Sequence, residues 1–76
     1  MAGQKIGKKE LKKLLTKAQG DPAFRDKLMR SAKDTLTNEG LNPEQVWVDF
    51  FQGLNANNFV DEMNEAIRVT PSEAAT

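Results

Sequence analysis

Three carboxylates close to the C-terminal end are the residues whose types and spacing could support chemistry. Asp61, Glu62 and Glu65 lie close together in the sequence, and Asp61 and Glu65 are one helical turn apart. Two carboxylates on one helix face can hold a hard metal ion or act as a general acid and a general base. The sequence shows no second set of ligands, however, so the pattern favours a solvated acidic face.

The side chains that most enzymes use for catalysis or metal binding are missing from this sequence. The 76-residue chain contains no cysteine and no histidine. These absences exclude a disulfide scaffold, thiolate and ordinary zinc sites, and a histidine-dependent catalytic triad. A chain of this length forms one small domain, which leaves no room for an enclosed active site. We therefore expect no catalytic activity, no cofactor and no bound metal ion.

The charged residues are divided unevenly along the chain, although the formal net charge is zero. Residues 1–33 hold ten basic groups and three acidic ones, a net charge of +7. Residues 34–76 hold eight acidic groups and one basic group, a net charge of −7. Two interpretations remain open. The two halves attract each other or solvate two surfaces of one domain, or the basic half steers the protein towards an acidic partner.

The segment from Asp21 to Gly40 is the most clearly bounded helix in the sequence. Asp21 is a favourable N-cap, and Pro22 follows at the first helical position, where its missing N–H costs nothing. Apolar residues recur on one face at three- and four-residue steps, and Gly40 ends the run. These residues are Phe24, Leu28, Met29, Ala32 and Leu36. The pattern predicts one amphipathic helix over residues 22–38 that packs on other elements.

Three further helices complete the predicted architecture. The first covers residues 8–18, where a stripe of leucines lies opposite a row of lysines. The third is capped by Asn42 and carries most of the aromatic residues. The fourth is capped by Asn57 or Asn58 and ends before Pro71, because the residue that precedes a proline is excluded from the helical region. We predict an all-α fold, a small bundle of about four short helices.

The same pattern divides the chain into three parts. Residues 1–7 are expected to form a flexible N-terminal arm, residues 8–69 a single helical domain, and residues 70–76 a disordered tail. No apolar stretch approaches the ~18 residues that a membrane-spanning helix needs, and no signal peptide is visible. The expected location is cytoplasmic, without a membrane partner.

The aromatic residues of the predicted third helix allow two interpretations. Trp47, Phe50 and Phe51 recur on one helical face, which is typical of the core of a bundle. Alternatively, part of this face is exposed as a docking surface, because Trp and Phe contribute much of the binding energy of interfaces. Val46 and Val48 make the apolar face wider than one buried stripe requires. This excess favours a protein partner or a homodimer.

Lysines follow the outer face of the predicted first helix. They are Lys5, Lys8, Lys9, Lys12, Lys13 and Lys17. Such a face can neutralise phosphates without reading a base sequence. No basic recognition helix and no exposed aromatic platform accompany it, and the leucine stripe is too narrow to anchor a membrane-surface helix. We therefore expect a solvated face rather than a surface for nucleic acid or membrane.

The helix over residues 22–38 resembles the helical leader regions of precursors to ribosomally synthesised, post-translationally modified peptides. The similarity is to nitrile-hydratase-type and nitrogen-fixation-type leaders, which share a D-P-x-F-R-x-x-L start and a G-L finish. In this chain the start is residues 21–28 and the finish is residues 40–41, about 22 residues in all with Gly20. In such families this region holds the precursor on a modifying enzyme. The residues carried over are Asp21, Phe24, Arg25, Leu28 and Leu36.

The resemblance implies that the folded domain recruits a peptide-modifying enzyme and that the C-terminal segment is the substrate. Binding one end of a chain raises the effective concentration of the other end at an active site. The residues implied as the modified segment are Val69, Thr70, Ser72, Glu73 and Thr76. Without cysteine, backbone N-methylation and ester or amide links remain as chemistries. The alternative is a small helical adaptor or regulatory subunit that binds a protein partner through its aromatic face and is never modified.

Overall fold

Five helices form over residues 3–70, the part of the chain that the computed structural model describes. They are α1 (Lys8–Gly20), α2 (Pro22–Arg30), α3 (Ala32–Asn38), α4 (Gln45–Gln52) and α5 (Phe59–Val69). The prediction of an all-α fold is therefore confirmed for these residues. The number of helices is five rather than four.

The additional helix arises because the predicted helix over residues 22–38 is divided at Ser31. The backbone of Ser31 leaves the helical region, with φ −131° and ψ 56°. The Ser31 N–H still donates to the carbonyl of Lys27, and the Thr35 hydroxyl donates to the same carbonyl at 3.1 Å. Serine is a poor residue inside a helix because its side chain competes for backbone hydrogen bonds. The apolar periodicity continues across the break, so periodicity alone predicts one helix.

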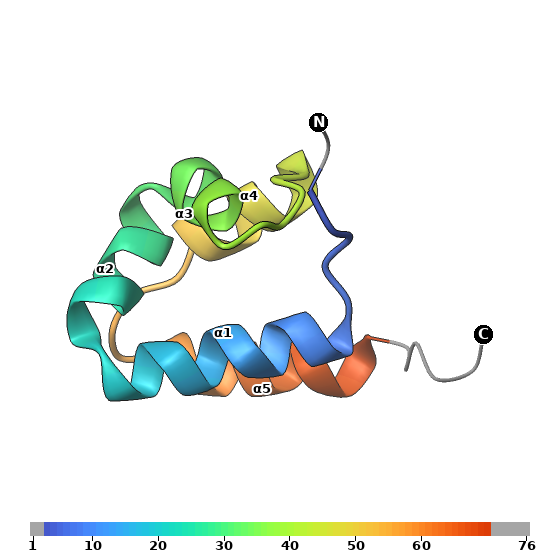
Figure 1. Ribbon diagram of the computed structural model, residues 1–76. Helices are drawn as coiled ribbons and strands as arrows, with labels where there is room; N and C mark the ends of the chain where they lie inside the picture. The colour runs from blue at the N-terminus through green and yellow to red at the C-terminus, as the bar shows by residue number, and fades with distance from the viewer. Residues whose placement is uncertain (1–2, 71–76) are drawn as a thin grey trace.

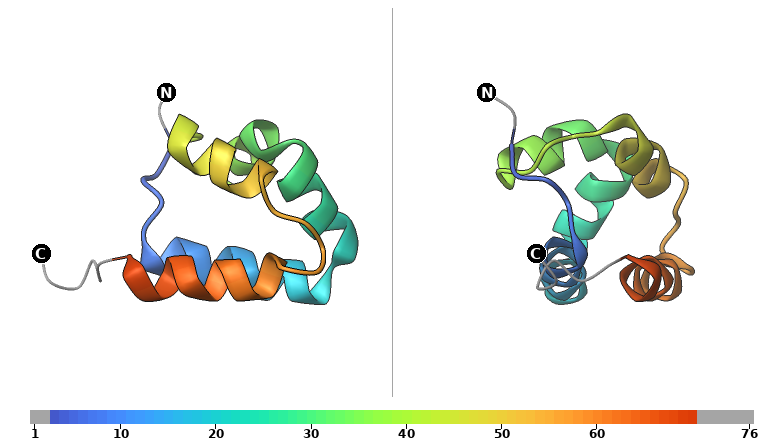
Figure 2. Two further views of the ribbon diagram at one scale, coloured as in Figure 1. Left: turned by 180° about the vertical axis from the view of Figure 1, so that it is seen from behind. Right: turned by 90° about the vertical axis from the view of Figure 1, so that its right-hand side faces the viewer.

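The helices are arranged in two layers. α1 and α5 lie side by side and run antiparallel, α3 and α4 form the second layer, and α2 rises from the end of α1 to that layer at one end of the molecule (Figures 1 and 2). α1 packs against α5 and α2, and α2 packs in turn against α3 and α4. The core lies between the two layers. Its most deeply buried large side chains are Leu11, Leu28, Leu36, Phe51, Phe59 and Met63.

The N-terminal segment before α1 is part of the fold, and the predicted flexible arm does not extend over residues 3–7. The Gln4 N–H donates to the carbonyl of Gly40, and the Asn42 N–H donates to the carbonyl of Gln4. Ile6 is buried in the core, with 3% of its surface exposed. The burial of Ile6 and the backbone pairing of Gln4 with the loop before α4 hold residues 3–7 on the domain. A segment of five residues is too short to show periodicity, so neither contact could be predicted from the sequence pattern.

The ends of the last two helices agree only in part with the sequence prediction. α4 begins at Gln45 with Glu44 as its N-cap, and the expected side-chain cap by Asn42 does not form. Asn42 instead uses its backbone to bond with Gln4. α5 ends at Val69, and Thr70 is extended with ψ 129°, as the residue before Pro71 must be. The predicted tail residues Ser72, Glu73 and Thr76 lie outside the described residues.

A candidate partner-binding groove

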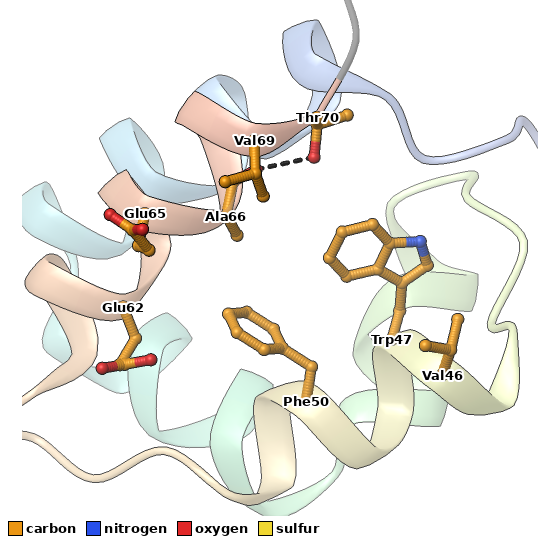
Figure 3. Close-up of a pocket in the computed structure, with 8 residues that line it drawn as sticks. All are labelled: Val46, Trp47, Phe50, Glu62, Glu65, Ala66, Val69 and Thr70. Carbon is orange, nitrogen blue, oxygen red and sulfur yellow. Dashed lines mark hydrogen bonds between the residues drawn. The ribbon is translucent and has the colours of Figure 1, made fainter.

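An apolar groove of about 290 Å³ lies between α4 and α5 (Figure 3). Its lining residues are Val46, Trp47, Phe50, Glu62, Glu65, Ala66, Val69 and Thr70. In Figure 3 the rings of Trp47 and Phe50 extend from α4 towards Ala66 and Val69 on α5. Its volume lies at the lower end of the ~300–1,000 Å³ of small-molecule sites, which usually carry convergent polar groups, whereas the polar side chains here are at the border. This groove is better suited to one or two large apolar side chains of a protein.

The groove exists because α4 has apolar residues on more of its circumference than the core can cover. Val48 and Phe51 face the core, with 7% and 0% of their surfaces exposed. Trp47 and Phe50 are half-buried, and Val46 is 67% exposed. The core interpretation is therefore confirmed for Phe51, whereas Trp47 and Phe50 pack against the core and also line the groove. A docking role for these two rings stays a prediction.

Edge-to-face aromatic contacts connect the groove to the core. The centroids of Trp47 and Phe50 are 5.8 Å apart with the rings at 89°, and those of Phe50 and Phe51 are 5.2 Å apart at 68°. Both arrangements are the edge-to-face contacts that aromatic quadrupoles favour. Because Phe51 is fully buried in the core, these contacts hold the rings of Trp47 and Phe50 in place.

The α5 side of the groove is bordered by carboxylates. Glu65 accepts hydrogen bonds from the guanidinium of Arg68, with the Nε contact at 3.2 Å. This bond and the positive charge of Arg68 lower the pKa of Glu65, and the same bond together with the negative charge of Glu65 raises the pKa of Arg68. A carboxyl group whose pKa is lower in the folded than in the unfolded protein stabilises the fold at pH values above its unfolded-state pKa. This stabilisation is lost as the pH falls through the lowered pKa. Both groups are exposed, so the pair adds little to stability.

Glu62 differs from Glu65 in its partners. Within residues 3–70, no basic group lies within ion-pair distance of the Glu62 carboxylate. α4 and α5 together hold four carboxylates and one basic side chain, Arg68. The groove therefore combines an apolar floor with a negatively charged border.

The residues carried over from the leader resemblance lie elsewhere and have structural roles. The Asp21 carboxylate caps α2 by accepting from the N–H groups of Ala23 at 3.1 Å and Phe24 at 3.3 Å. Phe24, Leu28 and Leu36 are buried in the core. None of these residues lines the groove. The structure therefore separates the carried-over residues from the aromatic candidates Trp47 and Phe50.

Arg25 is the carried-over residue whose role in the fold is least complete. Its guanidinium lies 3.4 Å from Asp26, and its side chain is 31% exposed. Its Nε atom is buried without a hydrogen-bond partner among the described residues. Arg25 therefore keeps only part of its side chain at the surface, and it lies on a different element from the groove.

One ion pair joins the basic and acidic halves within residues 3–70. Lys17 on α1 contacts Glu39 at 2.7 Å and also lies 4.7 Å from the centre of the Phe24 ring. The remaining lysines of α1 form no ion pair with the described acidic groups. The opposite charges of the two halves therefore form one tertiary ion pair among the described residues, and most of the charged side chains of both halves stay at the surface.

Outside the groove, the described part of the chain holds no metal site and one smaller cavity. Residues 3–70 contain no group of three or more acidic side chains arranged to hold a metal ion. A second, smaller cavity of about 100 Å³ lies beside the N-terminal segment, where the Glu10 carboxylate accepts from the Gly7 N–H. This cavity belongs to the packing of that segment. None of the helices described is both long and apolar enough to cross a membrane.

No protein-family model matches this chain, and no curated protein or solved structure matches it either. The candidate site therefore rests on the geometry of the chain itself. The apolar width of the predicted third helix indicated the α4 side of the groove, although Val48, the residue that falls furthest off the main face, is buried in the core and Val46 is the exposed one. The α5 side, Glu62 and Ala66, was missed, because nothing in the sequence indicates that α5 faces α4 across a gap.

Proposed function

We propose that this chain is a precursor peptide whose folded helical domain recruits a modifying enzyme to its C-terminal segment. The domain itself is a non-catalytic binding unit in this proposal. The groove between α4 and α5 binds the enzyme, and the segment that follows α5 is the substrate.

The observation that carries the proposal is the position of Val69 and Thr70 in the groove lining. They are the last described residues of the chain, so the following segment starts at the edge of the groove. A partner bound to Trp47 and Phe50 would hold that segment beside itself at a high effective concentration. The Thr70 hydroxyl donates to the carbonyl of Ala66 at 2.6 Å. Because this hydroxyl is already engaged, residues that follow Thr70 are the better candidates for modification.

A second candidate function is a small helical adaptor that binds the same kind of partner and is never modified. The burial of Phe24, Leu28 and Leu36 favours it, because the residues of the leader resemblance have a sufficient structural explanation. The adaptor also needs the groove, and it differs from the precursor only in the fate of the C-terminal segment.

Intact-mass analysis of the protein from its native cells, with fragmentation of residues 68–76, tests this proposal. We expect a mass shift by multiples of one methyl group, or by loss of water, confined to residues 69–76. The encoded mass in cells that express the neighbouring genes would contradict the precursor function and leave the adaptor. A variant without residues 71–76 keeps every residue of the groove and serves as the matched control for partner binding.

A further inference from the structure

We propose that the occupant of the groove is an amphipathic helix of another protein, with basic side chains beside its apolar ones. This inference rests on the proposed function, which requires a protein partner, and it names the chemistry of that partner. The basic side chains would face the carboxylate of Glu62, while an apolar side chain would enter between the α4 rings and α5.

The shape of the groove favours a helix as the occupant. Its α5 border runs from Glu62 to Val69, a length of about 10 Å at the ~1.5 Å rise per helical residue. This length matches about two turns of a docked helix, with anchors at three- or four-residue spacing. The part of the chain described here has no sheet whose edge could accept a peptide strand, so strand addition offers no alternative.

The charge around the groove favours a basic occupant. α4 and α5 carry Asp49, Asp61, Glu62 and Glu65 against Arg68 alone. Arg68 is already engaged with Glu65. Lysine or arginine beside the apolar anchors would therefore find an unengaged carboxylate at Glu62, and complementary charge would also raise the rate of association.

Two other occupants fit less well. A second copy bound through the same face would bring two sets of these carboxylates together, and like charges across an interface disfavour binding. The chain's own residues 71–76 contain Glu73 and no large apolar side chain, so they offer neither an anchor for the rings nor a counter-charge. A basic helix of a different protein satisfies both requirements.

Fluorescence of Trp47 gives a direct measurement, because it is the single tryptophan of the chain and lines the groove. The probes are two synthetic amphipathic helical peptides with identical leucine positions. One has lysine at its polar positions, and the other has glutamate. At ~0.15 M salt, where charges more than ~8 Å apart are screened, we expect the lysine peptide to shift the emission to shorter wavelength saturably. The glutamate peptide should leave it unchanged.

Two matched charge reversals locate the binding. Glu62→Lys should lower the affinity for the lysine peptide about tenfold, because it replaces an attraction between opposite charges by a repulsion between like charges. Asp61→Lys changes the same charge on the neighbouring exposed residue, which does not line the groove, and should change affinity less than about twofold. Both positions are exposed, so both variants are expected to fold.

Several results would overturn the inference. The first is equal affinity for the lysine and glutamate peptides. The second is an equal loss of affinity in Glu62→Lys and Asp61→Lys. The third is a Trp47 emission that neither peptide changes. A blue shift that grows with protein concentration alone would indicate a second copy in the groove. A red shift on removal of residues 71–76 would indicate the chain's own segment. Failure of the proposed function is separate, because an unmodified C-terminal segment leaves selective binding of the lysine peptide intact.

Discussion

Replacing Phe51 by alanine is expected to unfold most of the protein, whereas the same change at the adjacent Phe50 should leave it folded. Phe51 is fully buried, and truncation of a buried phenylalanine costs ~3–5 kcal/mol. A domain of this size has only ~3–5 kcal/mol of stability in total. Phe50 is half-buried, so its truncation should cost about 1 kcal/mol, the usual value for a single substitution.

Urea titrations followed by circular dichroism measure both variants against the natural protein. The folded Phe50→Ala variant should then bind the lysine peptide more weakly, because one wall of the groove is lost. Equal destabilisation by the two variants would show that both rings are core residues. In that case α4 would have no free apolar face, and the groove would not be a binding site.

The second large effect is expected at Ile6, in the segment that the sequence presents as an arm. Ile6→Ala should lower the free energy of unfolding by ~2–5 kcal/mol, because a buried aliphatic side chain leaves a cavity. Lys5→Ala, at the neighbouring exposed position, should change it by less than ~0.5 kcal/mol. Urea denaturation of both variants provides the comparison.

Hydrogen exchange adds a local measurement of the same segment. The amides of Gln4 and Asn42 donate to the carbonyls of Gly40 and Gln4, so both should exchange slowly in the natural protein. Fast exchange at both amides, together with an Ile6→Ala variant of unchanged stability, would mean that residues 3–7 are an arm after all.

Local signals in the sequence predicted most of the helices. The leucine stripe of α1 is buried as expected, at Leu11, Leu14 and Leu15. Asp21 caps α2, and the residue before Pro71 ends α5. These features depend on nearest neighbours along the chain, namely helical periodicity, capping and the restriction that proline imposes.

Features that depend on tertiary contacts were not predictable in the same way. The break at Ser31 is supported by the buried Thr35, whose hydroxyl bonds to Lys27 across the two helices. Val48 lies off the main aromatic face by periodicity, yet it is buried because α4 is rotated to place Val48 and Phe51 on the core. The same rotation places Trp47 and Phe50 at the groove. Only the α4 side of the candidate site could therefore be predicted from the sequence.

The most direct measurement of the central proposal is the mass of the C-terminal segment in native cells when the groove is blocked. Val46→Glu places a charge in the groove at a side chain that is 67% exposed, far from the segment in sequence. Val60→Glu is the matched control, a partly exposed valine of α5 outside the groove. Circular dichroism verifies that both variants fold. We predict a modified segment in the natural protein and in Val60→Glu, and the encoded mass in Val46→Glu. The same modification in all three proteins, or in none of them, would contradict recruitment through this groove.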